Sequence, residues 1–136
     1  MLNTQQKQAL IEQAIKARDV AYAPYSHYHV GAALLAANGE VFIGCNVENA
    51  AFPATICAER TAVVKAVSAG QQDFVAIAIA TVDGGSPCGI CRQVLNEFAP
   101  TLHVIITNDE GEIVLESSLD QLLPYGFGPS HLKTEK

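Results

Sequence analysis

The N-terminal segment of the chain spaces its apolar residues with the period of an α-helix. This pattern predicts a helix that begins at Thr4, its N-terminal cap, and ends at about Ala21, before Pro24 interrupts the period. The apolar residues at this spacing include Leu10, Ile11, Ala14 and Ile15.

After Pro24 the apolar residues change to the two-residue period of β-strands. The stretch "VGAALLAANGEVFIGCNVEN" predicts a β-hairpin with Asn38-Gly39 at its turn. In the second arm the alternation separates one face (Val41, Ile43, Cys45, Val47) from the other (Phe42, Gly44, Asn46, Glu48). Because Cys45 shares its face with aliphatic residues, we expect it to be a buried structural thiol.

The second half of the chain alternates helical segments with apolar runs. "ICAERTAVVKAV" predicts a helix that ends near Gly70, and "FVAIAIATV" predicts a strand covered on both faces. Ser86 and Pro87 fit the cap and first residue of the next helix, and Ser118 fits the start of a short one. Between them, "LHVIIT" and "EIVLE" predict two strands. The four-residue link "NDEG" between these strands is too short for a parallel crossover, so we expect the last strand to be antiparallel.

This succession predicts one domain over residues 1–136, an α/β fold in which helices cover a mixed sheet as a three-layer α/β/α sandwich. A chain of 136 residues can bury a continuous core without disulfides. Its apolar content of 49 % and mean hydropathy of +0.20 hint at contacts between subunits.

The charge balance and the absence of long apolar runs exclude several classes of partner. The net charge is −6, and the eight lysines and arginines do not cluster, which argues against a nucleic acid. No apolar run is long enough to span a bilayer, and no secretory leader opens the chain. We therefore expect a cytoplasmic protein with no membrane partner.

Four cysteines carry the candidate chemistry: Cys45, Cys57, Cys88 and Cys91. In a chain without a leader, metal binding or redox chemistry is favoured over structural disulfides. Cys88 and Cys91 lie three residues apart at a helix start, close enough for both sulfurs to bind one metal ion. The same pair alone would also suit a dithiol oxidoreductase, or a zinc-stabilised binding module without catalysis.

Cys57 and Glu59 favour a catalytic zinc site over those alternatives. Three thiolates would leave the fourth position of zinc for a water molecule, with Glu59 as a base that is not a ligand. Because residues two apart point about 200° from each other on a helix, both can reach one site only at the first helical turn. Helix N-termini, together with hydrogen bonds from Arg60 and Arg92, would balance the thiolate charge. Replacing either arginine should lower turnover or zinc retention.

The motifs "CAER" and "PCGICRQV" resemble the zinc-dependent deaminases. "YAPYSHYHVGAALL", "GCNVENAAF" and "LLPYGFGP" are similar to the small cytidine deaminases, the branch that acts on free nucleosides. The resemblance implies a five-stranded mixed sheet, one Zn²⁺ per subunit, and a homotetramer with sites shared between subunits. It also implies that cytidine and deoxycytidine are hydrolysed to uridine and deoxyuridine with release of ammonia, while Glu59 transfers the protons.

The resemblance assigns the remaining site residues. Asn46 and Glu48, which the strand alternation places on one face, would hold the ribose hydroxyls. Tyr28 would lie beside the base at a position that is usually Phe, and Phe127 would close the pocket of another subunit. Phe52 replaces a common Tyr, and Ile90 a common Ala.

Two other deaminase substrates remain alternatives. An aminopyrimidine antibiotic of the blasticidin type is argued against by "CNVEN", whose polar pair suits a ribose. A polynucleotide is argued against by the acidic charge. A metal role for His27 and His29, which flank Tyr28, is also less favoured than a surface position.

Overall fold

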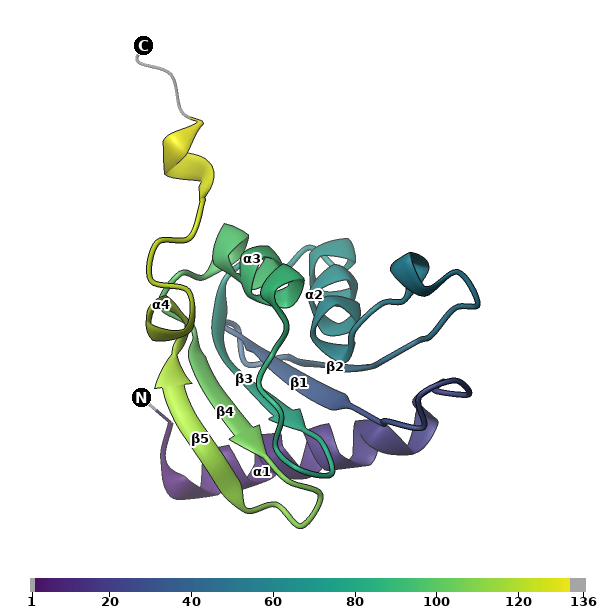
Figure 1. Cartoon of the computed structure of the whole chain (residues 1–136). Helices are drawn as coiled ribbons and strands as arrows, with labels where there is room; N and C mark the ends of the chain where they lie inside the picture. The colour runs from purple at the N-terminus through teal and green to yellow at the C-terminus, as the bar shows by residue number, and fades with distance from the viewer. Residues whose placement is uncertain (1, 133–136) are drawn as a thin grey trace.

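A five-stranded mixed sheet with helices on both faces forms the body of the protein (Figure 1). The computed structural model describes residues 2–132. The strand order is β2-β1-β3-β4-β5, in which β3 and β4 are parallel and the other neighbours are antiparallel. The predicted five-stranded sheet and antiparallel last strand are therefore confirmed. In chain order the elements are α1 Thr4–Ala17, β1 Gly31–Ala36, β2 Val41–Cys45, α2 Ala58–Ser68, β3 Phe74–Ala80, α3 Gly89–Phe98, β4 His103–Thr107, β5 Ile113–Ser118 and α4 Leu119–Leu122.

Helix α1 covers one face of the sheet, and α2 and α3 lie side by side on the other (Figure 1). Each face has its own apolar core. One cluster joins Ala62, Val63 and Leu95 of α2 and α3 to the sheet, and the other joins Leu10 and Ile11 of α1 to the opposite side. Because β3 is covered on both sides, its residues from Ala76 to Ala80 are buried, as its unbroken apolar run predicts.

The first helix differs from its prediction at both ends. Its N-cap is Asn3 and not Thr4, since the Asn3 side chain accepts a hydrogen bond from the Gln6 amide at 2.8 Å while the Gln6 side chain accepts one from Asn3 at 2.9 Å. The α-helix ends at Ala17, and residues Arg18–Val20 continue as a 3-10 turn. Both errors arise because helix boundaries depend on hydrogen bonds at the helix ends, which the apolar period does not encode.

The hairpin of β1 and β2 has its turn at Asn38-Gly39, as predicted, with Gly39 at φ 95°. Gly44 of β2 faces α2 so closely that a Cβ there would lie 2.4 Å from the Ala58 carbonyl oxygen. This contact brings α2 directly onto the sheet. It also shows that the Gly44 face of β2 is the buried one, so the expectation of a buried Cys45 is wrong: Cys45 is only half-buried.

Two features bear on surfaces and partners. None of the helices within residues 2–132 is both long and apolar enough to cross a membrane. The segment after α4 leaves the sheet and extends past α3 (Figure 1), and it carries exposed aromatic and aliphatic side chains at Tyr125, Phe127 and Leu132.

Candidate metal centre and substrate pocket

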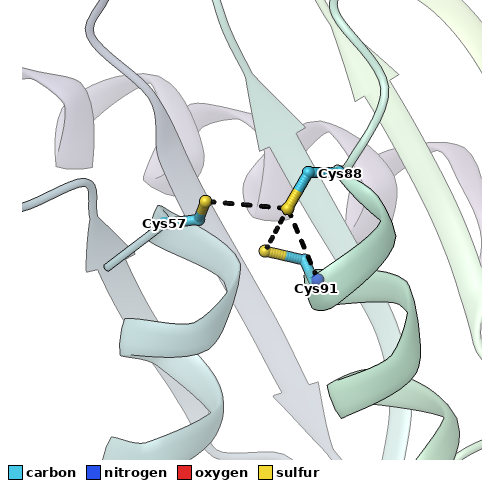
Figure 2. Close-up of side chains that lie close together, drawn as sticks. All are labelled: Cys57, Cys88 and Cys91. Atoms are coloured by element: carbon cyan, nitrogen blue, oxygen red, sulfur yellow. Dashed lines mark hydrogen bonds between the residues drawn. The ribbon is translucent and has the colours of Figure 1, made fainter. Parts of the chain in front are cut away.

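The starts of α2 and α3 bring three cysteine sulfurs together (Figure 2). Cys57 is the N-cap of α2 and Cys88 the N-cap of α3, both with extended backbone, and Cys91 lies in the first turn of α3. The Cys57 and Cys88 sulfurs are 3.8 Å apart, those of Cys88 and Cys91 are 3.4 Å apart, and all three lie within 4.8 Å of one another. None of the three is in a disulfide.

The sulfur separations fit a tetrahedral zinc site. Ligands at about 2.3 Å from zinc, the usual Zn–S distance, stand about 3.8 Å from each other along the edges of a tetrahedron. The two separations, 3.8 Å and 3.4 Å, are close to that value and far longer than a disulfide bond of about 2.05 Å. Three thiolates occupy three corners and leave the fourth for a non-protein ligand.

The helix start at Cys57 and one arginine favour the thiolate form of Cys57. The predicted helix start at Ser86 and Pro87 is wrong, because the Cys88 sulfur itself accepts the Cys91 amide at 3.5 Å and thus caps α3. Arg60 donates from Nη2 to the Cys57 sulfur at 3.4 Å. The Cys91 thiol and the Arg60 guanidinium lower the pKa of Cys57 to about 5. The hydrogen bond between Cys57 and Cys91, together with burial, raises the pKa of Cys91.

The prediction that Arg92 donates hydrogen bonds to the thiolates differs from what the structure shows. Its guanidinium donates to the Pro87 carbonyl at 2.8 Å, the Leu122 carbonyl at 3.0 Å and the Ser86 hydroxyl at 3.0 Å. These acceptors lie in the loop before α3 and at the end of α4. Arg92 therefore braces the loop that leads into Cys88, and within residues 2–132 its side chain donates to oxygen and not to sulfur.

Glu59 lies in the first turn of α2, where a residue two after the cap can face the same site as Cys57. Its side chain is buried, with 4 % exposure, yet it lines the cavity that the sulfurs also line. Burial raises the pKa of Glu59 to about 7. A carboxyl group with a pKa near neutrality can both accept and return a proton.

The cavity has a volume of about 270 Å³, and its two walls come from different parts of the chain. One wall is formed by Cys57, Glu59 and Cys88 at the helix starts. A second wall is formed by the segment before β1 and the segment after β2. It contains Tyr28, Asn46 and Glu48, together with Ser26, Val30 and Thr55.

The side chain of Asn46 joins the two segments of the second wall. It is 7 % exposed, accepts the Val30 amide at 3.0 Å and donates to the Tyr28 carbonyl at 2.7 Å. One N–H and one oxygen lone pair remain for a ligand.

Glu48 holds the turn at Tyr25 and Ser26. Its carboxylate accepts their amides at 3.0 Å and 3.1 Å and also the Ser26 hydroxyl. The hydrogen bond from the Ser26 hydroxyl lowers the pKa of the Glu48 carboxyl, so Glu48 is ionised at neutral pH and acts only as an acceptor.

The remaining predicted residues lie outside this cavity. Phe127 is 54 % exposed on the segment after α4, where its carbonyl accepts Asn96 Nδ2 at 3.3 Å and its ring stacks on His131. Phe52 is 69 % exposed and contacts Tyr25, and Ile90 is 62 % exposed at the start of α3.

Sequence reasoning missed four polar residues of the cavity. Ser26, Thr55, Thr81 and Ser86 line it from irregular segments. Their residue types are ordinary for loops, and no spacing rule connects them to the cysteines. Only the folded chain shows that these segments, up to 60 residues apart in number (26 to 86), share one cavity.

Comparisons with known proteins bear on the site as a whole. Residues 4–107 match the family model described as the cytidine and deoxycytidylate deaminase zinc-binding region. The chain is 48 % identical over 126 residues to a cytidine deaminase of Sporosarcina psychrophila, covering 90 % of this chain and 92 % of that protein. A crystal structure of cytidine deaminase from Burkholderia pseudomallei superposes with a TM-score of 0.84 at 47 % identity, covering 93 % of this chain and all of that one. The chain is also 34 % identical over 134 residues to a blasticidin-S deaminase of Bacillus cereus, covering 91 % and 94 % of the two proteins.

Proposed function

This chain belongs to the cytidine deaminase family of zinc-binding hydrolases, and on that premise we propose that it converts cytidine and deoxycytidine to uridine and deoxyuridine with release of ammonia. The observation that carries the proposal is a single cavity whose one wall holds sulfurs and a buried carboxylate, and whose other wall holds an amide and an ionised carboxylate. A nucleoside has a matching division between a base that reacts and a sugar that is held.

Cys57, Cys88 and Cys91 would hold the zinc ion. When bound there, zinc supplies Lewis-acid activation of water near neutral pH. Arg60 would offset part of the thiolate charge through its contact with the Cys57 sulfur.

Glu59 is the proton carrier in this proposal. Its carboxylate is buried and lines the cavity next to the sulfurs, so that it would reach both the attacking water and the pyrimidine ring. It would take a proton from water, place it on ring N3 and then transfer one to the departing amino group at C4. The overall balance is one water consumed and one ammonia released.

Asn46 and Glu48 would hold the sugar. Glu48 is an acceptor for ribose hydroxyls, and the free N–H of Asn46 is a donor. The negative charge of Glu48 at this wall favours a nucleoside over its 5′-phosphate. Tyr28 lines the same cavity, and its ring would form a wall for the base.

We also propose a homotetramer in which Phe127 closes the cavity of a neighbouring subunit. Phe127 is absent from the lining of its own cavity, and it lies on an extending segment with exposed Tyr125 and Leu132. Analytical ultracentrifugation would test the assembly. Phe127→Ala should raise the KM for cytidine in an assembled enzyme, whereas a monomeric wild-type protein with full activity would overturn this proposal.

The decisive test combines a metal assay with ultraviolet monitoring of cytidine. We expect one zinc per chain and conversion to uridine in the purified protein. Glu59→Gln should keep the zinc and the fold but lower kcat by about 10²–10⁴-fold. Glu97→Gln, which changes an exposed glutamate on α3, is the matched control and should match the wild type. Zinc-loaded, folded protein that leaves cytidine unchanged would falsify the proposal.

The similarity to a blasticidin-S deaminase defines the second candidate. Glu48 and Asn46 suit the hydroxyls of a ribose, which favours the nucleoside. Measuring kcat/KM for cytidine and for blasticidin S on the same preparation separates the two, and a higher value for the antibiotic would reverse the assignment.

A further inference from the structure

Tyr28 is held at its backbone by the wall that carries Asn46 and Glu48. Its amide donates to the Ser26 hydroxyl oxygen at 3.0 Å, and its carbonyl accepts Asn46 Nδ2 at 2.7 Å. The Ser26 hydroxyl in turn donates to Glu48. The position of the Tyr28 ring is thus coupled to both side chains proposed to bind the sugar.

The other end of Tyr28 reaches the loop between β3 and α3. The Tyr28 hydroxyl donates to Asp83 Oδ1 at 2.7 Å, and Thr81 Oγ1 lies 3.2 Å from the same oxygen. Thr81, which is buried, also accepts the amides of Gly84 and Gly85 at 2.7 Å and 2.9 Å. This loop leads into Cys88. Tyr28 therefore connects the wall that carries Asn46 and Glu48 to the segment that precedes a zinc-binding cysteine.

Gly85 provides the space that the Tyr28 hydroxyl occupies. A Cβ at position 85 would lie 2.8 Å from the hydroxyl oxygen, closer than side chains tolerate, and Gly85 is not among the glycines with positive φ. A side chain at position 85 would therefore displace the Tyr28 hydroxyl, while the backbone conformation there does not itself call for glycine.

Charge supports the direction of the hydrogen bond. The hydroxyl of Tyr28 lowers the pKa of Asp83, and burial raises the pKa of Tyr28. At neutral pH the pair is a phenol that donates and a carboxylate that accepts, which is a stronger hydrogen bond than one between neutral groups.

We propose that the Tyr28–Asp83 link sets the width of the nucleoside cavity and so determines how tightly the substrate is held. This inference rests on the proposed function. Asp83 is a positioning residue, since it acts through Tyr28, and Gly85 is the residue that makes room for the link. The link also means that the hydroxyl of Tyr28 is committed to Asp83 and does not serve as a substrate contact.

The first test is a double-mutant cycle between Tyr28→Phe and Asp83→Ala. Each single variant should raise the KM for cytidine about fivefold, with kcat within about twofold and the zinc content unchanged. Because both substitutions remove the same hydrogen bond, the double variant should be no worse than either single variant. Asp83→Asn keeps an acceptor oxygen and should restore most of the wild-type KM.

The second test uses the space at Gly85. Gly85→Ala should raise the KM by pushing the tyrosine ring into the cavity, and Tyr28→Phe in the same chain should relieve that effect. Gly89→Ala is the control, because a Cβ at Gly89 would meet nothing within 4 Å. The same rescue should appear in the thermal unfolding temperature, a measurement that needs no substrate.

The outcomes separate the two proposals. An active wild type whose Tyr28→Phe and Asp83→Ala variants keep the wild-type KM, or whose effects add in the double variant, overturns the link and leaves the proposed function standing. A Gly85→Ala defect that Tyr28→Phe does not relieve also overturns it. A wild type that does not deaminate cytidine refutes the proposed function, and the link's effect on the substrate is refuted with it.

Discussion

The two walls of the cavity are built in opposite ways. The metal wall consists of helix starts, where Cys57 and Cys88 are N-caps and Glu59 lies within one turn of its cap. The second wall, called the sugar wall for its proposed role in holding the sugar, consists of irregular segments before β1 and after β2. Its side chains are fixed by hydrogen bonds between residues far apart in the chain, such as Asn46 to Tyr28 and Tyr28 to Asp83.

The difference has a physical cause. A helix start presents free amides and a positive end of the helix dipole, so it suits thiolates whatever the rest of the fold does. A neutral sugar offers only hydroxyls, which need donors and acceptors at set positions and gain little from a helix end. We therefore expect the metal wall to respond to changes of charge and ligand, and the sugar wall to changes in its hydrogen-bond network.

The largest effect should come from Cys88→Ser. Serine is a good N-cap, so α3 keeps its start, but the hydroxyl does not replace a thiolate as a zinc ligand. We expect zinc to be lost and deamination to fall below detection, while circular dichroism stays that of the wild type. Cys45→Ser is the control, because the Cys45 thiol is half-buried on β2 and is not part of the sulfur cluster. A zinc-loaded, active Cys88→Ser variant would show that the metal wall is assigned wrongly.

The next largest effects should distinguish the roles of Arg60 and Arg92. Arg60→Ala removes the donor to the Cys57 sulfur and should weaken zinc binding about 10–100-fold in a chelator competition. Arg92→Ala removes only bonds to oxygen acceptors, so it should lower the free energy of unfolding by about 1–3 kcal/mol and leave zinc affinity within about threefold. Equal losses of zinc affinity in both variants would contradict this division.

On the sugar wall, Asn46→Ala should lower the stability of the fold and also weaken the binding of the substrate. It leaves the partly buried amide of Val30 and the carbonyl of Tyr28 without their partner, at a cost of about 2 kcal/mol in the free energy of unfolding. The KM for cytidine should rise while zinc content is unchanged. Asn49→Ala, which removes an exposed hydrogen bond to the Ala51 amide, is the control for stability. A loss no larger than that of the control would place Asn46 outside the network.

The same division decided what the sequence predicts well. Spacing at helix starts pairs Cys57 with Glu59 and Cys88 with Cys91. The ligand chemistry of zinc, together with the family resemblance, then predicts that the two pairs share one site. The zinc-binding cysteine triad is accordingly confirmed. The first hairpin and the antiparallel last strand also follow from alternation and link length, because these depend on neighbouring residues.

The errors fall where an outcome depends on contacts between distant segments. The period-two pattern of β2 is correct, but the prediction put its aliphatic face inward, whereas α2 packs on Gly44 and leaves Cys45 half-buried. Arg92 lies on the expected helix face, yet carbonyls of the loop before α3 and of α4 take its donors. Asp83 carried no signal at all, because its partner Tyr28 lies 55 residues away.

The opposite face of the sheet, under α1, gives the smallest predicted effect and shows how separate the cavity is. Glu116 of β5 is paired with Lys7 of α1 at 2.6 Å and with His103 of β4. The Lys7 ammonium and the His103 ring lower the pKa of Glu116 below its ordinary 4.5. A lowered pKa in the folded chain means that the pair stabilises the fold above the ordinary value and that this contribution is lost as the pH falls through the lowered one. Since the pair is partly exposed, Glu116→Gln should lower the free energy of unfolding by about 0.5–1 kcal/mol at neutral pH and by less as the pH falls below 4.5, with kcat/KM unchanged. Urea unfolding at about pH 7 and about pH 3 measures this difference.

Glu12→Gln on α1 is its control, because Glu12 forms no ion pair within residues 2–132. A change in kcat/KM for cytidine in Glu116→Gln would show that the two faces of the sheet are coupled. The properties of the cavity would then depend on α1 as well as on its own two walls.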